Sequence, residues 1–191
     1  MTAPEDITRW LSRMQEGDAD ALDQVVRLLY AELREMARHK LRDERGGHTL
    51  SATALVNEAY VKLARHDRID AGSRTRFFAV AARTMRRVLV DYARTRKRLK
   101  RGGGVAPIPL EEVEPFLSLE EADEILALDD ALERLAALNP RGAEVVEQRF
   151  YAGLSVEETA ELLGVSTKTV QRDWIAARAW LRKEVAGTNE P

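Results

Sequence analysis

Side chains able to hydrogen-bond to nucleic acid are clustered near the start of one predicted helix. They are Thr167, Lys168, Gln171 and Arg172. Their hydroxyl, ammonium, amide and guanidinium groups suit base edges and phosphates in the major groove of DNA. Such groups also occur on the solvated face of an ordinary pair of antiparallel helices, so the neighbouring elements must decide between the two interpretations.

A helix-turn-helix is the predicted scaffold for these side chains. Residues 153–181 read GLSVEETAELLGVSTKTVQRDWIAARAWL. Ser155 and Glu158 form the capping-box pattern that satisfies free amide groups at the start of a helix. Gly164 can adopt the positive φ that ends this helix, and Ser166 can cap the next one. The pattern therefore predicts two helices joined by a short turn.

The two helices have facing apolar positions. The second helix carries one apolar stripe, which comprises Val170, Trp174, Ala177 and Leu181. We expect this stripe to pack on Ala160 and Leu163 of the first helix. The small side chain of Ala160 allows the close, steep crossing that a DNA-binding helix-turn-helix requires. The hydrogen-bonding side chains are then left outside the packed surface.

Charge is segregated along the chain, although the formal net charge is only -2. Between residues 74 and 101 Asp91 is the only acid, and the basic residues are Arg74, Arg76, Arg83, Arg86, Arg87, Arg94, Arg96, Lys97, Arg98, Lys100 and Arg101. Between residues 111 and 133 there is no lysine or arginine, and the acids are Glu111, Glu112, Glu114, Glu120, Glu121, Asp123, Glu124, Asp129, Asp130 and Glu133. A cationic helix that lacks acidic partners favours nucleic-acid contact over a solubilising tail. The near-neutral total is compatible with such a surface.

The composition is that of an ordinary globular protein. Of the 191 residues 45% are apolar and none is cysteine, which excludes disulfides, thiolate zinc sites and a cysteine nucleophile. No apolar run is long enough to span a membrane. The N-terminal MTAPEDITRW lacks the basic and then apolar regions of a signal peptide. We therefore expect a cytoplasmic protein with no membrane association.

The sequence offers little for catalysis or metal binding. His39, His48 and His66 are scattered and lack the spacing of metal ligands, so no metal site is expected. Glu157 and Glu158 lie at a helix start, where their charge favours the helix dipole, and no nucleophile accompanies them. We expect no enzymatic activity, no catalytic residue and no cofactor.

Apolar residues recur at helical spacing along most of the chain, and no segment has a convincing strand pattern. The predicted helices cover about 7–14, 18–43, 51–65, 73–100, 122–138, 140–151, 155–163 and 166–186. Glycines and prolines are concentrated in RGGGVAPIPLEEVEP, residues 101–115, which favours a flexible linker. The predicted fold is all-α, with two helical bundles joined by this linker.

Three segments carry a resemblance to a known family. ALVNEAYVKLAR at 54–65 resembles region 2.2 of sigma factors, and FFAVAARTMRRVLVDYARTRKR at 77–98 resembles regions 2.3 and 2.4. The segment 131–181, from ALERLAALNPR to the helix-turn-helix, resembles region 4. The chain resembles, over about residues 5–186, the extracytoplasmic-function (ECF) sigma factors, small members of the sigma-70 family that keep only regions 2 and 4.

The resemblance implies a role and a division of the chain. Such a protein binds core RNA polymerase, directs it to the minus-10 and minus-35 promoter elements and helps to open the duplex. An anti-sigma factor is a further candidate partner. The implied parts are region 2 over 1–100, a linker over 101–120, region 4 over 121–186 and a tail over 187–191.

The resemblance also assigns individual residues. The helix that would dock on the largest catalytic subunit of the polymerase carries Leu55, Asn57, Glu58 and Lys62. The positions that contact or melt the minus-10 element are Arg87, Asp91, Tyr92 and Arg94, with Arg96, Lys97 and Arg98 on phosphates. The positions that read the minus-35 element are Lys168, Thr169, Gln171 and Arg172. By apolar spacing alone, Leu55 and its apolar neighbours need only be core residues.

The chain departs from the family pattern at a few positions. Many ECF sigma factors have Asn where this chain has Arg87, and Trp where it has Val80. The preferred minus-10 base therefore cannot be copied from the family, and MRRVLVDYAR at 85–94 instead resembles an ECF-like branch. Asp173 is unusual for a DNA-facing position. It can accept a hydrogen bond from cytosine or pair with Arg172.

Alternatives remain open for the acidic block and for the whole chain. The acidic block is either a soluble connector or a mimic of nucleic acid that folds against the basic helix and masks it. The first rival function is a dimeric helix-turn-helix regulator that binds a palindrome without polymerase. The second is a helical adaptor with no role on DNA.

Overall fold

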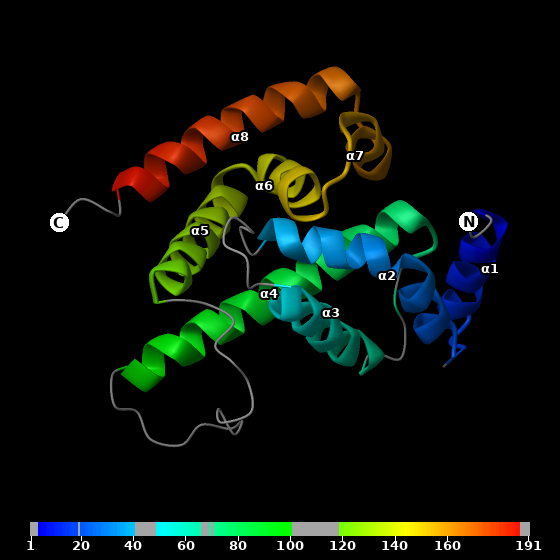
Figure 1. Ribbon diagram of the computed structural model, residues 1–191. Helices are drawn as coiled ribbons and strands as arrows, with labels where there is room; N and C mark the ends of the chain where they lie inside the picture. Colours follow the sequence, from blue (N-terminus) through cyan, green and yellow to red (C-terminus); the bar gives the residue numbers. More distant parts are fainter. Residues whose placement is uncertain are drawn as a thin grey trace.

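The computed structural model describes residues 4–18, 20–40, 49–65, 69, 71–100 and 119–187. All regular elements in this part of the chain are helical, which confirms the all-α class. In chain order they are α1 (Pro4–Gln15), α2 (Ala21–Lys40), α3 (Thr49–Ala64), α4 (Arg74–Lys100), α5 (Leu119–Leu138), α6 (Pro140–Val146), the π-turn η1 (Glu147–Tyr151), α7 (Val156–Leu163) and α8 (Thr167–Gly187) (Figure 1).

The long helix α4 is the centre of the molecule. It packs against α1, α2 and α3 on one side and against α5, η1 and α7 on the other. Its apolar residues recur at helical spacing, and Phe77, Met85 and Leu89 are buried among side chains such as Leu29 of α2 and Leu55 of α3. The helical spacing of these apolar residues thus places one face of α4 in the core.

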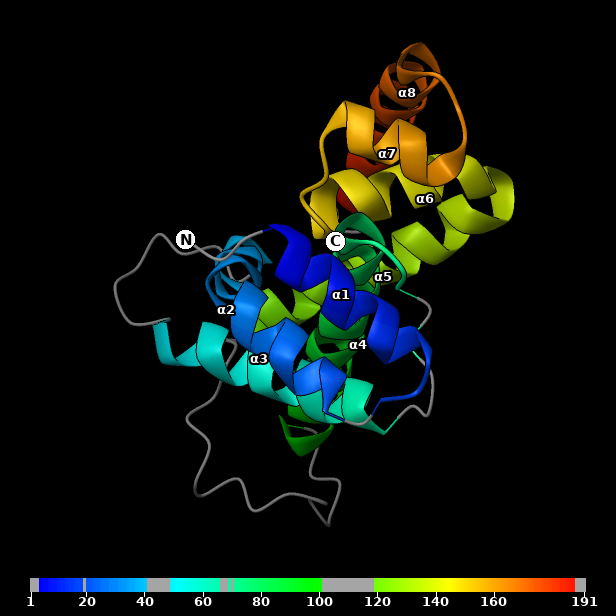
Figure 2. The same ribbon diagram turned by 90° about the vertical axis from the view of Figure 1, so that its right-hand side faces the viewer.

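The C-terminal helices form a second group on α4. α5 contacts α4, α6 and α8, and α7 contacts α8. In both views α8 lies on the far side of the molecule from α3 (Figures 1 and 2). Buried side chains from Leu11 in α1 to Leu132 in α5 and Leu181 in α8 belong to one apolar cluster. The division at 101–120 stays a prediction, because 101–118 lies outside the described residues.

Local signals set the ends of the C-terminal helices. Asn139 caps α6 by accepting a hydrogen bond from the Gly142 amide at 3.0 Å, and Pro140 occupies the first helical position, where no amide hydrogen is needed. The Ser155–Glu158 capping box at the start of α7 is confirmed in both directions. These caps fix where α6 and α7 begin.

One predicted helix is in fact divided. The pattern over 140–151 predicts a continuous α-helix, but the structure changes to a wider π-turn over Glu147–Tyr151. The Ala152 amide donates to the Glu147 carbonyl at 3.0 Å, a spacing of five residues. Such a turn closes i→i+5 hydrogen bonds and so departs locally from the α-helical period on which the prediction over 140–151 rested. It aims Glu147 and Tyr151 at α4.

Candidate nucleic-acid interface

α7 and α8 form the predicted helix-turn-helix. Gly164 has a φ of 65°, and the Val165 amide donates to the Ala160 carbonyl at 3.0 Å, so the turn closes tightly after α7. Val170 of α8 is buried against Ala160 in a cluster that also includes Val145 of α6. The expected contact between Val170 and Ala160 is confirmed, whereas the stripe residues Ala177 and Leu181 join the larger cluster instead.

The start of α8 presents the hydrogen-bonding side chains to solvent. Thr167, Lys168, Gln171 and Arg172 are all exposed. Thr169 differs, because its amide donates to the Ser166 hydroxyl at 3.1 Å and the two hydroxyl oxygens lie 2.9 Å apart. The Thr169 side chain therefore belongs to the cap of α8.

Asp173 does not belong to this exposed surface. It is 6% exposed, and Arg141 of α6 donates from Nε to its Oδ2 at 2.5 Å. Arg172 lies farther away, with Nε 3.6 Å from Oδ1. The hydrogen bond from Arg141 lowers the pKa of Asp173. Asp173 is therefore placed to hold α8 on α6 rather than to accept from cytosine, and sequence reasoning missed its main partner.

An exposed apolar side chain completes the face of α8. Ile175 is 68% exposed and follows Arg172 by three residues and Gln171 by four, so the three share one side of the helix. Sequence reasoning did not select it. An apolar residue outside the apolar stripe of α8 is expected to be exposed, and this could have identified Ile175 from the sequence. Apolar side chains on such a face can contact the methyl group of thymine.

The cationic helix α4 carries the side chains assigned to the minus-10 element. Arg87 is exposed. Asp91 is paired with Lys62 of α3, whose Nζ lies 2.5 Å from Oδ2. Tyr92 is half-buried, and its burial and then the negative charge of Glu58 raise its pKa. The structure thus brings together the residues assigned to DNA and to the polymerase along the α3–α4 contact.

The C-terminal part of α4 borders a pocket. The pocket has a volume of about 450 Å³ and is lined by Asp91, Arg94, Thr95, Lys97, Arg98 and Leu126. The first five of these residues lie on α4, and Leu126 lies on α5. Arg98 donates to the Thr95 hydroxyl at 3.2 Å, and Arg96 is half-buried. Three of the lining side chains, Arg94, Lys97 and Arg98, are cationic. Such a pocket suits an unstacked base of a strand whose phosphates lie along the helix.

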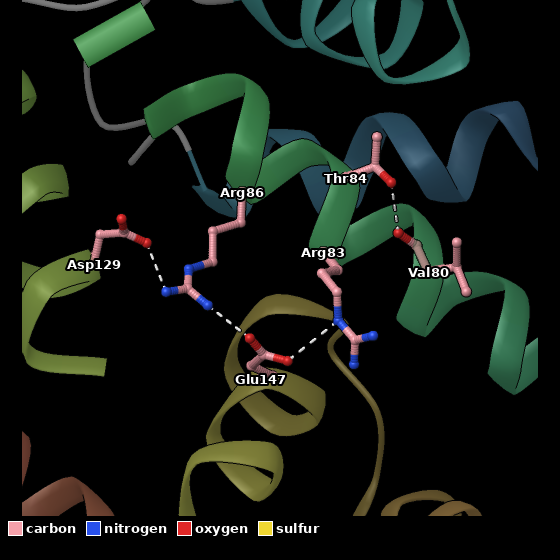
Figure 3. Close-up of polar contacts among 6 residues, drawn as sticks. All are labelled: Val80, Arg83, Thr84, Arg86, Asp129 and Glu147. Carbon is pink, nitrogen blue, oxygen red and sulfur yellow. Dashed lines mark hydrogen bonds and ion pairs between the residues drawn. The ribbon is translucent and has the colours of Figure 1, made fainter. Parts of the chain in front are cut away.

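Arg86 of α4 binds two carboxylates from the C-terminal helices (Figure 3). Its Nη2 lies 2.6 Å from Oδ1 of Asp129 in α5, and its Nη1 lies 2.6 Å from Oε1 of Glu147 in η1. Arg83 reaches the other oxygen of Glu147, with Nε 3.4 Å from Oε2. The guanidinium of Arg86 lies 5.6 Å from the centre of the Tyr151 ring. Burial raises the pKa of Tyr151 to about 12, so its hydroxyl stays neutral beside these charges.

A comparison with protein families identifies the family of this chain. A family model described as ECF sigma factor matches residues 4–187. The chain belongs to the ECF sigma factor family. Its members are non-enzymatic transcription initiation factors, so this sigma factor has a role in transcription initiation. A comparison with curated proteins found no match.

Helix α3 of this sigma factor offers an exposed face next to α4. Asn57 and Glu58 are exposed, and the Lys62 side chain is 34% exposed. Leu55 is 1% exposed and lies in the core. It therefore stabilises the packing of α3 and offers no surface to the polymerase. Val61, which sequence reasoning did not select, is 42% exposed beside these polar residues. An exposed apolar residue among polar ones is a common feature of protein interfaces.

Two kinds of site are not found in the part of the sigma factor that the structure describes. No group of three or more His, Asp or Glu side chains there could hold a metal ion. His48 and His66 lie outside that part. Its helices also include none with the length and apolar character needed to cross a membrane.

Proposed function

We propose that this sigma factor binds core RNA polymerase, directs it to a promoter with two recognition elements and helps to open the DNA. The observation that carries the proposal is the occurrence, in one chain, of an exposed hydrogen-bonding helix start on α8 and a cationic face on α4. A regulator that binds one palindromic site needs only the first of these surfaces.

At the minus-35 element, the start of α8 enters the major groove. Lys168 and Arg172 provide cationic donors for guanine edges or phosphates, and Gln171 provides the amide that pairs with adenine. The Ser166–Thr169 cap and the Arg141–Asp173 pair hold these side chains in position without contacting the DNA themselves. Specific reading thus rests on the exposed side chains of one short segment.

At the minus-10 element, α4 receives the strand that becomes unpaired. Arg87 and Arg94 bind phosphates, Tyr92 supplies an aromatic surface for an unstacked base, and the neighbouring pocket accommodates a base. Arg96, Lys97 and Arg98 extend the cationic path along the backbone of the strand. Each bundle binds DNA weakly alone, and attachment to one polymerase raises their effective concentration at a correctly spaced promoter.

The polymerase is bound through the exposed face of α3. Asn57, Glu58 and Lys62 provide polar contacts, and Val61 provides an apolar one. Lys62 also binds Asp91 of α4, so the docking face and the minus-10 face share an ion pair. In this proposal the DNA-binding face of α4 therefore lies next to the polymerase.

Charge reversal on α8 separates the proposal from its rivals. Lys168→Glu with Arg172→Glu is expected to abolish promoter-specific transcription by the reconstituted polymerase while leaving binding to core polymerase unchanged. The matched control is Arg182→Glu with Lys183→Glu, two exposed cations near the other end of the same helix. A dimeric regulator would lose operator binding and show no effect on polymerase, and an adaptor would show no effect on DNA. Either of those results overturns the proposal.

A further inference from the structure

The acidic residues of α5 and η1 occupy the cationic face of α4. Besides Arg83 and Arg86, two residues assigned to the minus-10 element take part. Arg94 Nη2 lies 3.6 Å from Oδ2 of Asp129, and Lys97 Nζ lies 2.8 Å from Oδ1 of Asp123. Carboxylates of the same chain thus neutralise cations that the proposed function assigns to phosphates. Glu111, Glu112 and Glu114 of the acidic block lie outside the described residues.

The centre of this contact is shielded from water, and its edge is open. The Arg86 side chain is 15% exposed, and its partner Asp129 is almost fully buried. Such charges depend on each other, because an unpaired buried charge costs free energy. Arg94 and Lys97 at the edge are about half-exposed, so salt and competing polyanions act on them. The ion pairs of Arg86 are therefore stable, whereas a competing polyanion can replace the carboxylates that pair with Arg94 and Lys97.

The same contact keeps the DNA-reading helices close together. α4 has 27 residues, which corresponds to a length of about 40 Å. α7 packs directly against α4, and α8 follows after the turn at 164–166. The minus-10 and minus-35 elements are named for positions about 25 base pairs apart, which corresponds to about 85 Å along the DNA. α4 and α8 therefore cannot reach both elements without moving apart.

We propose that the structure is a closed, self-inhibited state in which α5 and η1 mimic nucleic acid on α4. The ion pairs of Asp129 and Glu147 stabilise this closed state. It opens when core polymerase and promoter DNA compete for α1–α4 and for α5–α8. The proposal rests on the proposed function for the identity of the DNA. Because only the open fraction is competent to bind, the closed state lowers the apparent affinity of the free protein for DNA.

The first test is a distance measurement in the free protein. The chain has no cysteine, so spin labels can be attached at Ala64→Cys in α3 and Ala179→Cys in α8, both exposed positions. Pulsed electron resonance should give one narrow distance in the otherwise unchanged protein. The double variant Asp129→Asn with Glu147→Gln should shift much of that distribution to longer distances. An unchanged distribution in this variant would overturn the proposal.

A matched control separates the loss of specific ion pairs from the loss of charge. Asp130→Asn with Glu133→Gln removes the same charge from exposed positions of α5, for which the described residues give no ion pair to α4. This control should keep the narrow distance. Asp123→Asn alters only the edge of the contact, where the carboxylate side chain is 59% exposed. It should open the protein in a smaller fraction of molecules without disturbing the core.

The second test is the affinity for single-stranded DNA, measured without polymerase. It uses a Lys168→Glu, Arg172→Glu background so that α8 does not contribute. At low salt, Asp129→Asn with Glu147→Gln should bind roughly tenfold more tightly than the background, and Asp123→Asn about twofold. The Asp130, Glu133 control should change affinity much less. Equal affinities for the two double variants would overturn the proposal.

Failure of this proposal is distinguishable from failure of the proposed function. Both tests use the free protein, whereas the proposed function is tested by transcription with core polymerase. Normal transcription with an unchanged distance in the Asp129, Glu147 variant would leave the sigma factor role intact and remove self-inhibition. Helicity by circular dichroism, unchanged between the two double variants, establishes that the comparison is between folded proteins.

Discussion

Arg141 at the start of α6 donates a hydrogen bond from Nε to Oδ2 of Asp173 at 2.5 Å, and so joins α6 to the recognition helix. Asp173 follows directly after Arg172, one of the exposed side chains assigned to base reading. The buried carboxylate thus fixes the rotation of α8 while its neighbours face outward. Asp173 therefore stabilises the packing of α8 against α6, although it lies in the sequence next to residues assigned to DNA contact.

The first prediction concerns acid stability. The pKa of Asp173 is lowered in the folded protein by the hydrogen bond from Arg141, so its ionised form stabilises the fold above the unfolded-state pKa of about 3.9. This stabilisation is lost as the pH falls through the lower, folded-state pKa. Asp173→Asn should lower the free energy of unfolding in urea at pH 7, and the difference from the unchanged protein should shrink below pH 4.

The control for this experiment is Asp130→Asn, at an exposed position of α5. It should have nearly the same free energy of unfolding as the unchanged protein at both pH values. A difference between Asp173→Asn and the unchanged protein that persists undiminished at the lowest pH would show that Asp173 does not stabilise the fold through its charge.

The second prediction concerns the turn between α7 and α8. Gly164 has a φ of 65°, and a Cβ added there would meet no atom within 4 Å. The cost of Gly164→Ala therefore comes from the backbone alone and should be about 1–2 kcal/mol in the free energy of unfolding. Gly164→Asn should cost less, because Asn tolerates this conformation. Equal stability of the Ala variant and the unchanged protein in urea titrations would show that the positive φ of Gly164 carries no cost for other residues.

Sequence patterns predicted the helices well because each has a local signal. The capping box at Ser155, the cap at Ser166 and the apolar stripe of α8 each depend on residues a few positions apart. The same reasoning placed the exposed side chains at the start of α8. Helix boundaries and exposed faces of this kind follow from short-range spacing and need no knowledge of the tertiary contacts.

Partners distant in the sequence could not be predicted in this way. Arg86 meets Asp129 and Glu147, which lie 43 and 61 residues away. The sequence offered folding of the acidic block against the basic helix as one of two alternatives and did not identify these pairs. The π-turn that aims Glu147 at α4 departs from the α-helical period on which the prediction over 140–151 rested. Leu55 was assigned to the polymerase by resemblance, although its burial is what the apolar spacing required. Long-range pairing and the depth of a side chain come from the tertiary packing.

The third prediction concerns Ile175. Its side chain is 68% exposed, so Ile175→Ala should change the free energy of unfolding by less than about 0.5 kcal/mol. If Ile175 contacts a thymine methyl in the minus-35 element, replacing that thymine by uracil should weaken binding about fourfold, as expected for one apolar carbon. Ile175→Ala should bind both DNAs equally. A uracil effect of the same size in the variant would exclude this contact.

The fourth prediction concerns the docking face of α3. Glu58→Lys with Asn57→Ala should weaken binding to core polymerase by about tenfold, because both side chains are exposed on the face assigned to the polymerase. The measurement is fluorescence anisotropy of the labelled sigma factor titrated with core polymerase. The control is Glu161→Lys, an exposed acid on α7 with the same charge change as Glu58→Lys. Equal affinities for the two variants would place the docking surface elsewhere.

Run-off transcription tests directly whether the protein acts as a sigma factor. Core RNA polymerase, the purified protein and fragmented DNA from the same genome are combined, and the 5′ ends of the transcripts are sequenced. A sigma factor should give discrete start sites that share two upstream elements and that are absent with core polymerase alone. Transcripts no different from those of core polymerase alone would exclude the sigma factor role.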